Sequence, residues 1–174
     1  MATKAVDSLR KINVNGCTLR YANIADSDAL FQLEQASYPA DEMASLESIK
    51  MRIQEAGEYF LILQSSENEI MGFINGTCVE SKDFGHESMT SHAKDGSHLV
   101  IHSVTIQEKY RRRRNGSELV KAYVEVMLSR QSLSSILLLS KANLLEFYRK
   151  CGFSVRRLSQ IVHGKVFYNL TCRD

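Results

Sequence analysis

Blocks of alternating or clustered apolar residues run along nearly all of this 174-residue chain. Period-two alternation or short apolar runs predict strands at residues 17–24, 59–63, 70–79, 99–106, 135–139, 153–158 and 165–171. Helical spacing predicts helices over 29–38 and 46–56, after Gly116, and from Asn143 to Lys150. The order indicates a mixed α/β domain with a strand, helix, strand crossover in its middle.

Local signals set several boundaries of these elements. Asp26 and Asn143 are predicted to cap the helices that follow them, and Pro39 ends the first helix. The polar stretch 81–97 carries no predicted element and is long for a structureless connection. We therefore expect that stretch to be either mobile or functional.

Composition narrows the class of protein. With 44% apolar residues, one Pro and no repeat or linker, residues 1–174 are expected to form a single domain, with a polar N-terminal extension of about residues 1–15. The longest aliphatic run, 136–139, is too short to span a membrane. Four cysteines without CxxC spacing and no apolar leader suggest free thiols and a cytoplasmic location. A net charge of +2 gives no reason to expect binding to nucleic acid or to a membrane.

A run of four arginines, Arg111 to Arg114, precedes Asn115-Gly116 and lies between a predicted buried strand and a predicted helix. The N–H groups at a helix start favour a bound anion, and guanidinium groups bind phosphate oxygens in a bidentate manner. A ligand with several phosphates fits this turn. The alternative is an ordinary solvated charge run or an import signal.

Two further side chains are candidates for chemistry. His102 interrupts the apolar strand 99–106 and is either a core residue or a base that is neutral near pH 7. His98 lies about 13 Å away along an extended strand, so the pair cannot share one metal ion, and no metal site is predicted. His86 and His92 are expected to face solvent. Tyr148, taken alone, is most simply a core residue.

Taken together, these segments resemble the GNAT acetyltransferase superfamily from about Cys17 to the C-terminus. The resemblance rests on the element order, the strand LVIHSVTI, the basic turn and the motif FYRKCGF. The segment SYPADEMASLESIKMRI (37–53) is similar to the first helical region of the arylalkylamine (serotonin) N-acetyltransferase group. The resemblance implies a mixed, mostly antiparallel central sheet flanked by helices on both faces.

The same resemblance implies acetyl-CoA as co-substrate. The backbone of the strand end would pair with the pantetheine arm, and the basic turn would hold the pyrophosphate. Arg111 and Gly116 match the ends of the family's turn pattern, whereas Arg114 stands where its first Gly belongs. The implied cofactor-binding residues are Val104, Thr105, Ile106, Arg111, Arg112, Arg113, Arg114, Asn115, Gly116, Ser117, Asn143 and Tyr148.

The catalytic residues implied by the resemblance are His102 and Tyr148. In the arylalkylamine group two strand histidines serve amine deprotonation; His102 matches the second, and Val100 occupies the first. Deprotonation is therefore expected to run through water and His102, because an amine with a pKa near 10 is protonated at pH 7. Tyr148 matches the tyrosine that protonates the leaving thiolate.

The acceptor is expected to be a small-molecule amine. Asp41 and Glu42, beside the only proline, would attract its positive charge, and Tyr38 and Pro39 complete the candidate substrate-binding set; an ordinary acidic loop is the alternative. The predicted activity is N-acetyl transfer from acetyl-CoA to an arylalkylamine or polyamine by direct attack in a ternary complex. A protein or peptide N-acetyltransferase and, more remotely, a noncatalytic nucleic-acid-binding module that uses the arginine run remain open.

Overall fold

One mixed sheet with helices on both of its faces forms the body of the protein. The computed structural model describes residues 9, 13–159 and 167–172. Within these residues the sheet has the strand order β1-β2-β3-β4-β5-β6-β8-β7. The strands are β1 (Asn13–Val14), β2 (Cys17–Tyr21), β3 (Phe60–Gln64), β4 (Ile70–Val79), β5 (His98–Ile106), β6 (Ser135–Ser140), β7 (Ser154–Leu158) and β8 (Tyr168–Cys172). All neighbours are antiparallel except β5 and β6. The predicted fold class is therefore confirmed.

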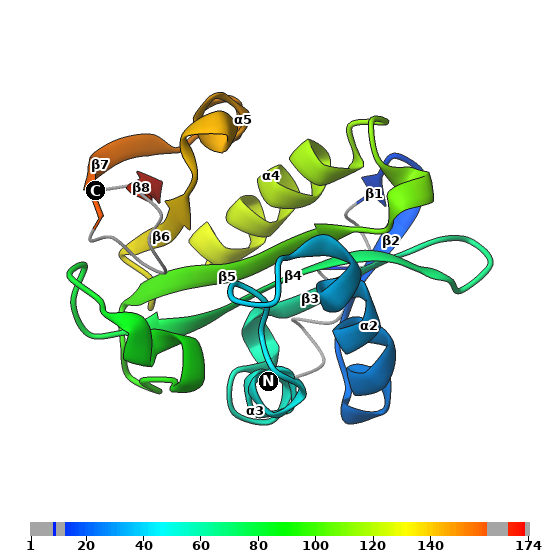
Figure 1. Ribbon diagram of the computed structural model, residues 1–174, viewed down its shortest axis with the longest axis horizontal. Coiled ribbons are helices and arrows are strands. Elements are labelled where there is room, and N and C mark those ends of the chain that lie inside the picture. Colours follow the sequence, from blue (N-terminus) through cyan, green and yellow to red (C-terminus); the bar gives the residue numbers. More distant parts are fainter. Residues whose placement is uncertain (1–8, 10–12, 160–166, 173–174) are drawn as a thin grey trace.

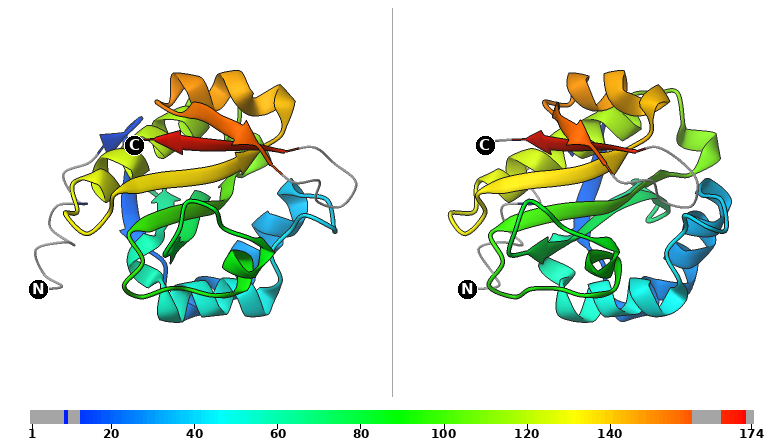
Figure 2. Two further views of the ribbon diagram at one scale, coloured as in Figure 1. Left: turned by 90° about the vertical axis from the view of Figure 1, so that its left-hand side faces the viewer. Right: turned by 60° about the vertical axis from the view of Figure 1, so that its left-hand side comes forward.

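The helices are α2 (Ser27–Ser37), α3 (Leu46–Glu55), α4 (Asn115–Leu128) and α5 (Leu145–Lys150). Figures 1 and 2 show α2 and α3 on one face of the sheet and α4 on the other, with α5 beside α4. Each face has its own buried apolar cluster. Leu30, Ile49 and Phe73 belong to the cluster under α2 and α3, whereas Leu119 and Ile74 belong to the larger cluster under α4.

Local chemistry accounts for most element boundaries. The Ser45 hydroxyl accepts from the Ser48 amide at 3.1 Å and caps α3. Helix α2 ends at Ser37, before Pro39 as predicted, because a residue that precedes proline is disfavoured in the helical region. Gly152, at φ +97°, follows α5 in a conformation that favours glycine.

Two predicted caps are wrong. Asp26 stands at the N-cap position of α2, but its carboxylate instead binds the Asn23 amide and the Arg20 guanidinium. Asn143 lies inside a 3₁₀ turn, 142–144, and α5 begins after Leu144 without any side-chain cap. In both places a 3₁₀ turn directly precedes the helix, and no side chain caps the helix start.

Other differences from the sequence-based elements are small. The first long strand ends at Tyr21 rather than at residue 24, because residues 24–26 form a 3₁₀ turn. The polar stretch 81–97 contains a 3₁₀ helix, η3 (His86–Thr90). The N-terminal extension and residues 160–166 fall mostly or wholly outside the described residues. None of the helices in the described ranges has the length and apolar character that crossing a bilayer requires.

Candidate active site

The centre of the candidate site is a bulge in β5. Asn75 of β4 pairs with Ser103 and Gly76 pairs with Ile101, which leaves His102 without a partner residue. A side chain is not tolerated at Gly76, since a Cβ there would lie 2.4 Å from the Val100 carbonyl oxygen. The extra residue lets two consecutive side chains, those of His102 and Ser103, contact groups on the same face.

Beyond the bulge, β5 and β6 are no longer paired and diverge. Their parallel pairing runs from His98 with Ser135 to Ile101 with Leu138 and stops there, although β5 continues to Ile106. The Val104 amide and carbonyl lie on this open edge, because both bond to a side chain instead of to β4. By alternation along the strand, Thr105 turns its own amide and carbonyl toward β4. Two of the three predicted cofactor-pairing residues, Val104 and Ile106, thus present their backbone to the gap.

Side chains bind to both of these backbone positions. The Tyr38 hydroxyl donates to the Val104 carbonyl at 2.9 Å and accepts from the Val104 amide at 3.0 Å. Arg111 Nε donates to the Ile106 carbonyl at 2.8 Å, and its Nη2 donates to Ser37 Oγ at 3.1 Å. Burial raises the pKa of Tyr38 to about 12, so the phenol keeps its proton. Tyr38, which was expected to bind the acceptor, therefore contacts the strand edge that was expected to bind the cofactor.

The arginine turn leads from this edge into α4. Arg112 and Arg114 both adopt left-handed backbone conformations, at φ +61° and +63°. Arg114 thus takes up the backbone conformation for which a glycine would ordinarily be chosen. Within the described residues, the N–H groups of residues 112 to 117 have no backbone acceptor. They are available to an anion at the N-terminus of a fourteen-residue helix.

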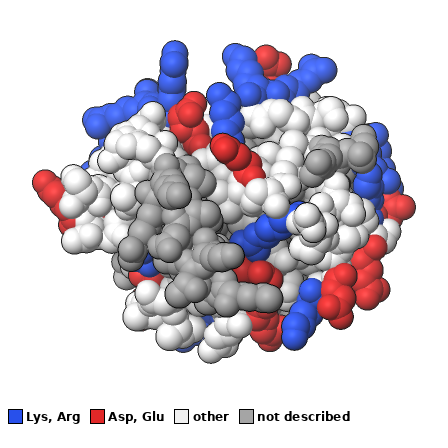
Figure 3. Space-filling model, turned by 180° about the vertical axis from the view of Figure 1, so that it is seen from behind, with Lys and Arg blue, Asp and Glu red and all other residues white. Residues whose placement is uncertain are grey.

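The turn is braced from two sides. Asn115 is buried and donates from Nδ2 to the Tyr110 carbonyl at 2.9 Å. Asn15, from the turn between β1 and β2, donates to the Arg113 carbonyl and to Asn115 Oδ1. The side chains of residues 112 to 114 are exposed. In the rear view of Figure 3, Lys and Arg side chains gather along the upper rim, where Figure 1 places α5 and the turn before α4.

His102 is held by a short hydrogen-bond chain. Its Nε2 lies 2.6 Å from Thr77 Oγ1, and the Thr77 hydroxyl donates to the Ser88 carbonyl at 2.8 Å. With its one proton directed at the Ser88 carbonyl, Thr77 accepts from His102, and this arrangement assigns the imidazole proton to Nε2 and the lone pair to Nδ1; the Ser88 carbonyl also forms a hydrogen bond with the His102 ring. Burial, with the positive charge of Arg52 adding to it, holds the pKa of His102 well below its usual value. His102 is therefore neutral at pH 7, as a base must be.

Charged side chains surround this chain of hydrogen bonds. Arg52 of α3 is fully buried and donates to Asn75 Oδ1 and to the Met89 carbonyl, both at 3.0 Å. Burial lowers the pKa of Arg52 to about 10, so it remains a cation. Glu34 of α2 is 1% exposed and accepts at Oε1 from the Ala44 amide and the Ser103 hydroxyl. Burial raises the pKa of this carboxyl group.

The sequence pattern did not predict this cluster. Glu34 and Arg52 each lie on the apolar face of a helix, at helical spacing from Leu30 and from Ile49. A charged residue within an apolar stripe was the available signal. Thr77 gives no comparable signal, because a threonine is ordinary in a strand.

Tyr148 of α5 is buried and packs edge-on against Phe147 and Phe153, with ring centroids 5.0 and 5.9 Å away. Among the described residues its hydroxyl has no hydrogen-bond partner. Burial raises the pKa of Tyr148, and the nearby Tyr38 adds to that effect. The phenol is thus a poor acid at equilibrium but a hydrogen-bond donor that holds its proton.

The predicted acceptor residues are spread over the α2–α3 connection. Glu42 forms an ion pair with Lys141 at 2.7 Å, which ties this connection to the end of β6. The Pro39 carbonyl accepts from the Glu42 and Met43 amides, and Asp41 is exposed. Of the four, Tyr38 contacts the open edge of β5 through its hydroxyl.

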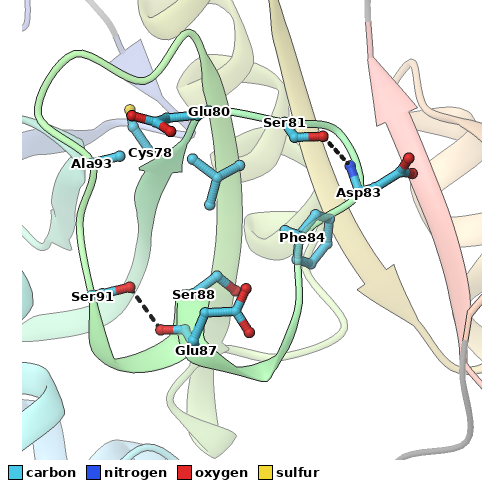
Figure 4. A pocket seen from close by; sticks show the side chains of 10 residues that line it. Cys78, Glu80, Ser81, Asp83, Phe84, Glu87, Ser88, Ser91 and Ala93 are labelled. Carbon is cyan, nitrogen blue, oxygen red and sulfur yellow. Dashed lines mark hydrogen bonds between the residues drawn. The ribbon is translucent and has the colours of Figure 1, made fainter.

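A separate hollow of about 270 Å³ lies inside the connection between β4 and β5 (Figure 4). Its lining residues are Cys78, Val79, Glu80, Ser81, Asp83, Phe84, Glu87, Ser88, Ser91 and Ala93. Ser88 links this hollow to the hydrogen-bond chain of His102, because its carbonyl accepts from Thr77. Residues 81–97, for which no helix or strand was predicted, therefore contribute Ser88 to the candidate site.

The remaining histidines differ in their surroundings. His86 is exposed as expected, but His92 is half-buried, accepts from the Cys78 amide at 3.0 Å and contacts the Tyr59 ring, so its predicted solvent exposure is wrong. His98 bonds to Ser135 at 2.8 Å. No cluster of three His, Cys, Asp or Glu side chains suited to a metal ion occurs in the described part of the chain.

Comparison with known proteins gives a family and several folds. The model of the Acetyltransferase (GNAT) family matches residues 27–153. No curated protein matches the chain in sequence. Among solved structures, the loading GNATL domain of CurA from Lyngbya majuscula has a TM-score of 0.82 at 15% identity, over 91% of this chain and 98% of that one.

Two further structures carry bound ligands in their descriptions. The GphF GNAT-like decarboxylase in complex with isobutyryl-CoA has a TM-score of 0.78 at 14% identity, over 89% of this chain and 98% of that one. AAC(6')-Ib in complex with Parmomycin and AcetylCoA has a TM-score of 0.65 at 15% identity, over 90% and 93%. Similarity at this level of identity establishes a shared fold.

Proposed function

Because the chain belongs to the GNAT acetyltransferase family, we propose that it transfers the acetyl group of acetyl-CoA to the nitrogen of a primary amine, an arylalkylamine or a polyamine. The observation that carries this proposal is the open edge of β5 after its bulge, which ends at a basic turn where, within the described part of the chain, the N–H groups of residues 112 to 117 have no backbone acceptor. An extended ligand with amides at one end and phosphates at the other matches that edge.

On this proposal the coenzyme binds along the gap between β5 and β6. One of its amide N–H groups would replace Tyr38 on the Val104 carbonyl, which leaves the Val104 amide free to donate elsewhere, and its phosphates would bind at residues 111–117. AAC(6')-Ib, whose structure carries AcetylCoA, and GphF, which carries isobutyryl-CoA, share the fold and support this choice of co-substrate.

The chemistry then needs a base, an oxyanion donor and a group that helps the sulfur to leave. His102 Nδ1, reached through ordered water, would take the proton of the attacking amine. The Val104 amide would donate to the thioester oxygen as negative charge develops there. The amine adds to the thioester carbon and the bond from carbon to sulfur breaks, so that the products are the N-acetyl amine and the coenzyme thiol. No acyl-enzyme is required.

Tyr148 would assist the departing sulfur. A phenol whose pKa lies above 10 transfers its proton only reluctantly to a thiolate, whose conjugate acid has a pKa near 8.5. Its contribution is therefore a hydrogen bond that strengthens as the sulfur gains negative charge, with the proton following late in the step.

The test is an acetyl-CoA-dependent thiol-release assay with tryptamine, spermidine and an N-terminal peptide as acceptors. Tyr148→Phe is expected to lower turnover about 100-fold and to leave acetyl-CoA affinity nearly unchanged. Tyr21→Phe, on β2 away from the site, is the matched control. The proposal is contradicted if none of the acceptors on the panel supports thiol release, or if calorimetry detects no binding of acetyl-CoA. Turnover of the peptide alone would favour a protein or peptide N-acetyltransferase.

A second candidate is removal of carbon dioxide from a carboxylated acyl-CoA, in which the carboxylate carbon leaves and a proton takes its place. The partly buried carboxylate of Glu42, which was expected to attract a cationic amine, is paired with Lys141, and this pairing weakens one argument for an amine acceptor. GphF, described as a GNAT-like decarboxylase, shares the fold. Incubation with malonyl-CoA and no amine separates the candidates, because only a decarboxylase converts it to acetyl-CoA.

A further inference from the structure

Arg52 is a buried cation with an unusual pair of partners. It is fully buried, and although the buried carboxyl group of Glu34 partly offsets the effect of burial on its pKa, no salt bridge to Arg52 is formed among the described residues. Its two terminal nitrogens bind one side-chain oxygen on β4 and one carbonyl of η3. Burying a charge without an ion pair is costly, and an apolar side chain of similar volume is often as stable or more so. A structural role alone gives little reason for an arginine here.

The two acceptors of Arg52 flank the hydrogen bond that orients the candidate base. Asn75 lies two residues before Thr77 on the same face of β4, and Met89 directly follows Ser88. Three hydrogen bonds therefore close a ring between β4 and η3. They run from Arg52 to Asn75 at 3.0 Å, from Thr77 to Ser88 at 2.8 Å and from Arg52 to Met89 at 3.0 Å. His102 Nε2 bonds to Thr77 within this ring at 2.6 Å.

We propose that Arg52 is a positioning residue for His102. By holding η3 against β4, it keeps the Ser88 carbonyl where it takes the only proton of Thr77. Thr77 can then only accept from His102, and the imidazole proton is fixed on Nε2. Nδ1 consequently carries no proton, and its lone pair can accept one, as a general base requires. The significance for catalysis rests on the proposed function; the fixed tautomer does not.

The ring of hydrogen bonds depends on the two terminal nitrogens of the Arg52 guanidinium, each of which donates to a different acceptor. Arg52 Nε has no partner among the described residues, so only the two terminal nitrogens take part. Lysine keeps the positive charge but carries one ammonium group on a flexible stem, and it cannot reproduce this planar two-point contact. Arg52→Lys therefore removes the ring and keeps the charge.

The experiment measures the tautomer directly. In protein labelled with ¹⁵N-histidine, the shifts of the two ring nitrogens report which one carries the proton, and His102→Gln assigns the signal. The wild type is expected to show His102 protonated at Nε2 only. Arg52→Lys should show mixed Nε2 and Nδ1 protonation, with kcat lowered about 10- to 100-fold and the KM for acetyl-CoA unchanged. Arg20→Lys is the matched control, because Arg20 forms a two-point contact with Asp26 away from the site.

A folded Arg52→Lys protein with an unmixed Nε2 tautomer overturns the proposal. Should that variant fail to fold, Arg52→Met, which removes the charge and replaces it with an apolar chain, is used in its place with the same expectation. Thr77→Val should mix the tautomers as well, and Thr77→Ser should restore Nε2; a pure Nε2 signal in Thr77→Val also contradicts the ring. Because the shifts are recorded without substrate, absence of acetyl transfer would remove the proposed function and leave this result standing.

Discussion

The two faces of β4 and β5 contrast sharply, although the same two strands build both. Toward α4 they present apolar side chains, among them Ile74, Cys78, Leu99 and Ile101, which belong to the larger apolar cluster. Toward α2 and α3, around the bulge, they present Asn75, Thr77, His102 and Ser103, and the helices add Glu34 and Arg52.

The polar face is the less stable arrangement of the two. Glu34 Oε2, Arg52 Nε and Asn75 Nδ2 are buried without partners among the described residues, and each such atom opposes folding. The α4 face stabilises the domain by burying apolar surface. The difference leads us to expect that the α4 side contributes more to stability, although the apolar cluster under α2 and α3 contributes as well, and that the candidate base lies on the α2 and α3 side.

The largest expected effect tests the apolar face. Leu119 of α4 is fully buried, and Leu119→Ala should lower the free energy of unfolding by about 2–5 kcal/mol, because it removes apolar contacts and leaves a cavity. Urea denaturation measures this loss. Turnover per folded molecule should remain that of the wild type. A loss of stability below about 1 kcal/mol would show that this face carries less of the stability than the contrast implies.

On the polar face, His102→Gln should lower turnover about 100-fold. Its effect on stability depends on pH. The pKa of His102 is lowered in the folded state, so below an unfolded pKa near 6.5 the unfolded chain binds a proton that the native protein does not. The wild type therefore loses stability as pH falls through that range, by up to about 1.4 kcal/mol per pH unit from this group.

His102→Gln should be less sensitive to acid over that range. Urea unfolding at pH 7, 6 and 5 compares the slopes, and the difference between the two proteins isolates His102 from His92 and His98, whose pKa values are also lowered by burial. Equal slopes in the two proteins would mean that His102 titrates normally and is not held neutral by its surroundings.

A smaller effect is expected at the open edge of β5. Tyr38→Phe removes the hydroxyl that bonds to both backbone groups of Val104, so a ligand no longer has to displace it. Acetyl-CoA affinity should rise about tenfold, the equivalent of one or two modest hydrogen bonds. Calorimetry measures it, with Tyr21→Phe as control. A fall in affinity would mean that the Tyr38 hydroxyl binds the coenzyme instead.

The smallest effect concerns backbone strain in the arginine turn. Arg114 has φ +63° and ψ +5°, a conformation that costs a non-glycine residue about 1–2 kcal/mol. Arg114→Gly should relieve that strain, while the greater entropy of glycine in the unfolded chain costs about 0.5–1 kcal/mol. The free energy of unfolding should therefore rise by about 0.5–1 kcal/mol, which thermal unfolding measures. Arg113, whose φ is not positive, is the control, and Arg113→Gly should not stabilise.

The sequence by itself determined the fold class and the place of the basic turn between β5 and α4. Hydrophobic periodicity depends only on near neighbours, so it located the strands and helices to within a few residues; the early end of β2 at Tyr21 is an example of the remaining error. Arg111 to Gly116 was recognisable because a basic run between a strand and a helix is itself a local pattern.

Only the tertiary structure brought together the groups that surround His102. Glu34, Arg52 and Thr77 lie on three different elements, and their partners are 69, 23 and 25 residues away along the chain. A hydrogen bond between distant residues leaves no periodic trace in a sequence, because it depends on strand register and on a one-residue bulge. The same reason explains why the contact of Tyr38 with Val104 could not be foreseen.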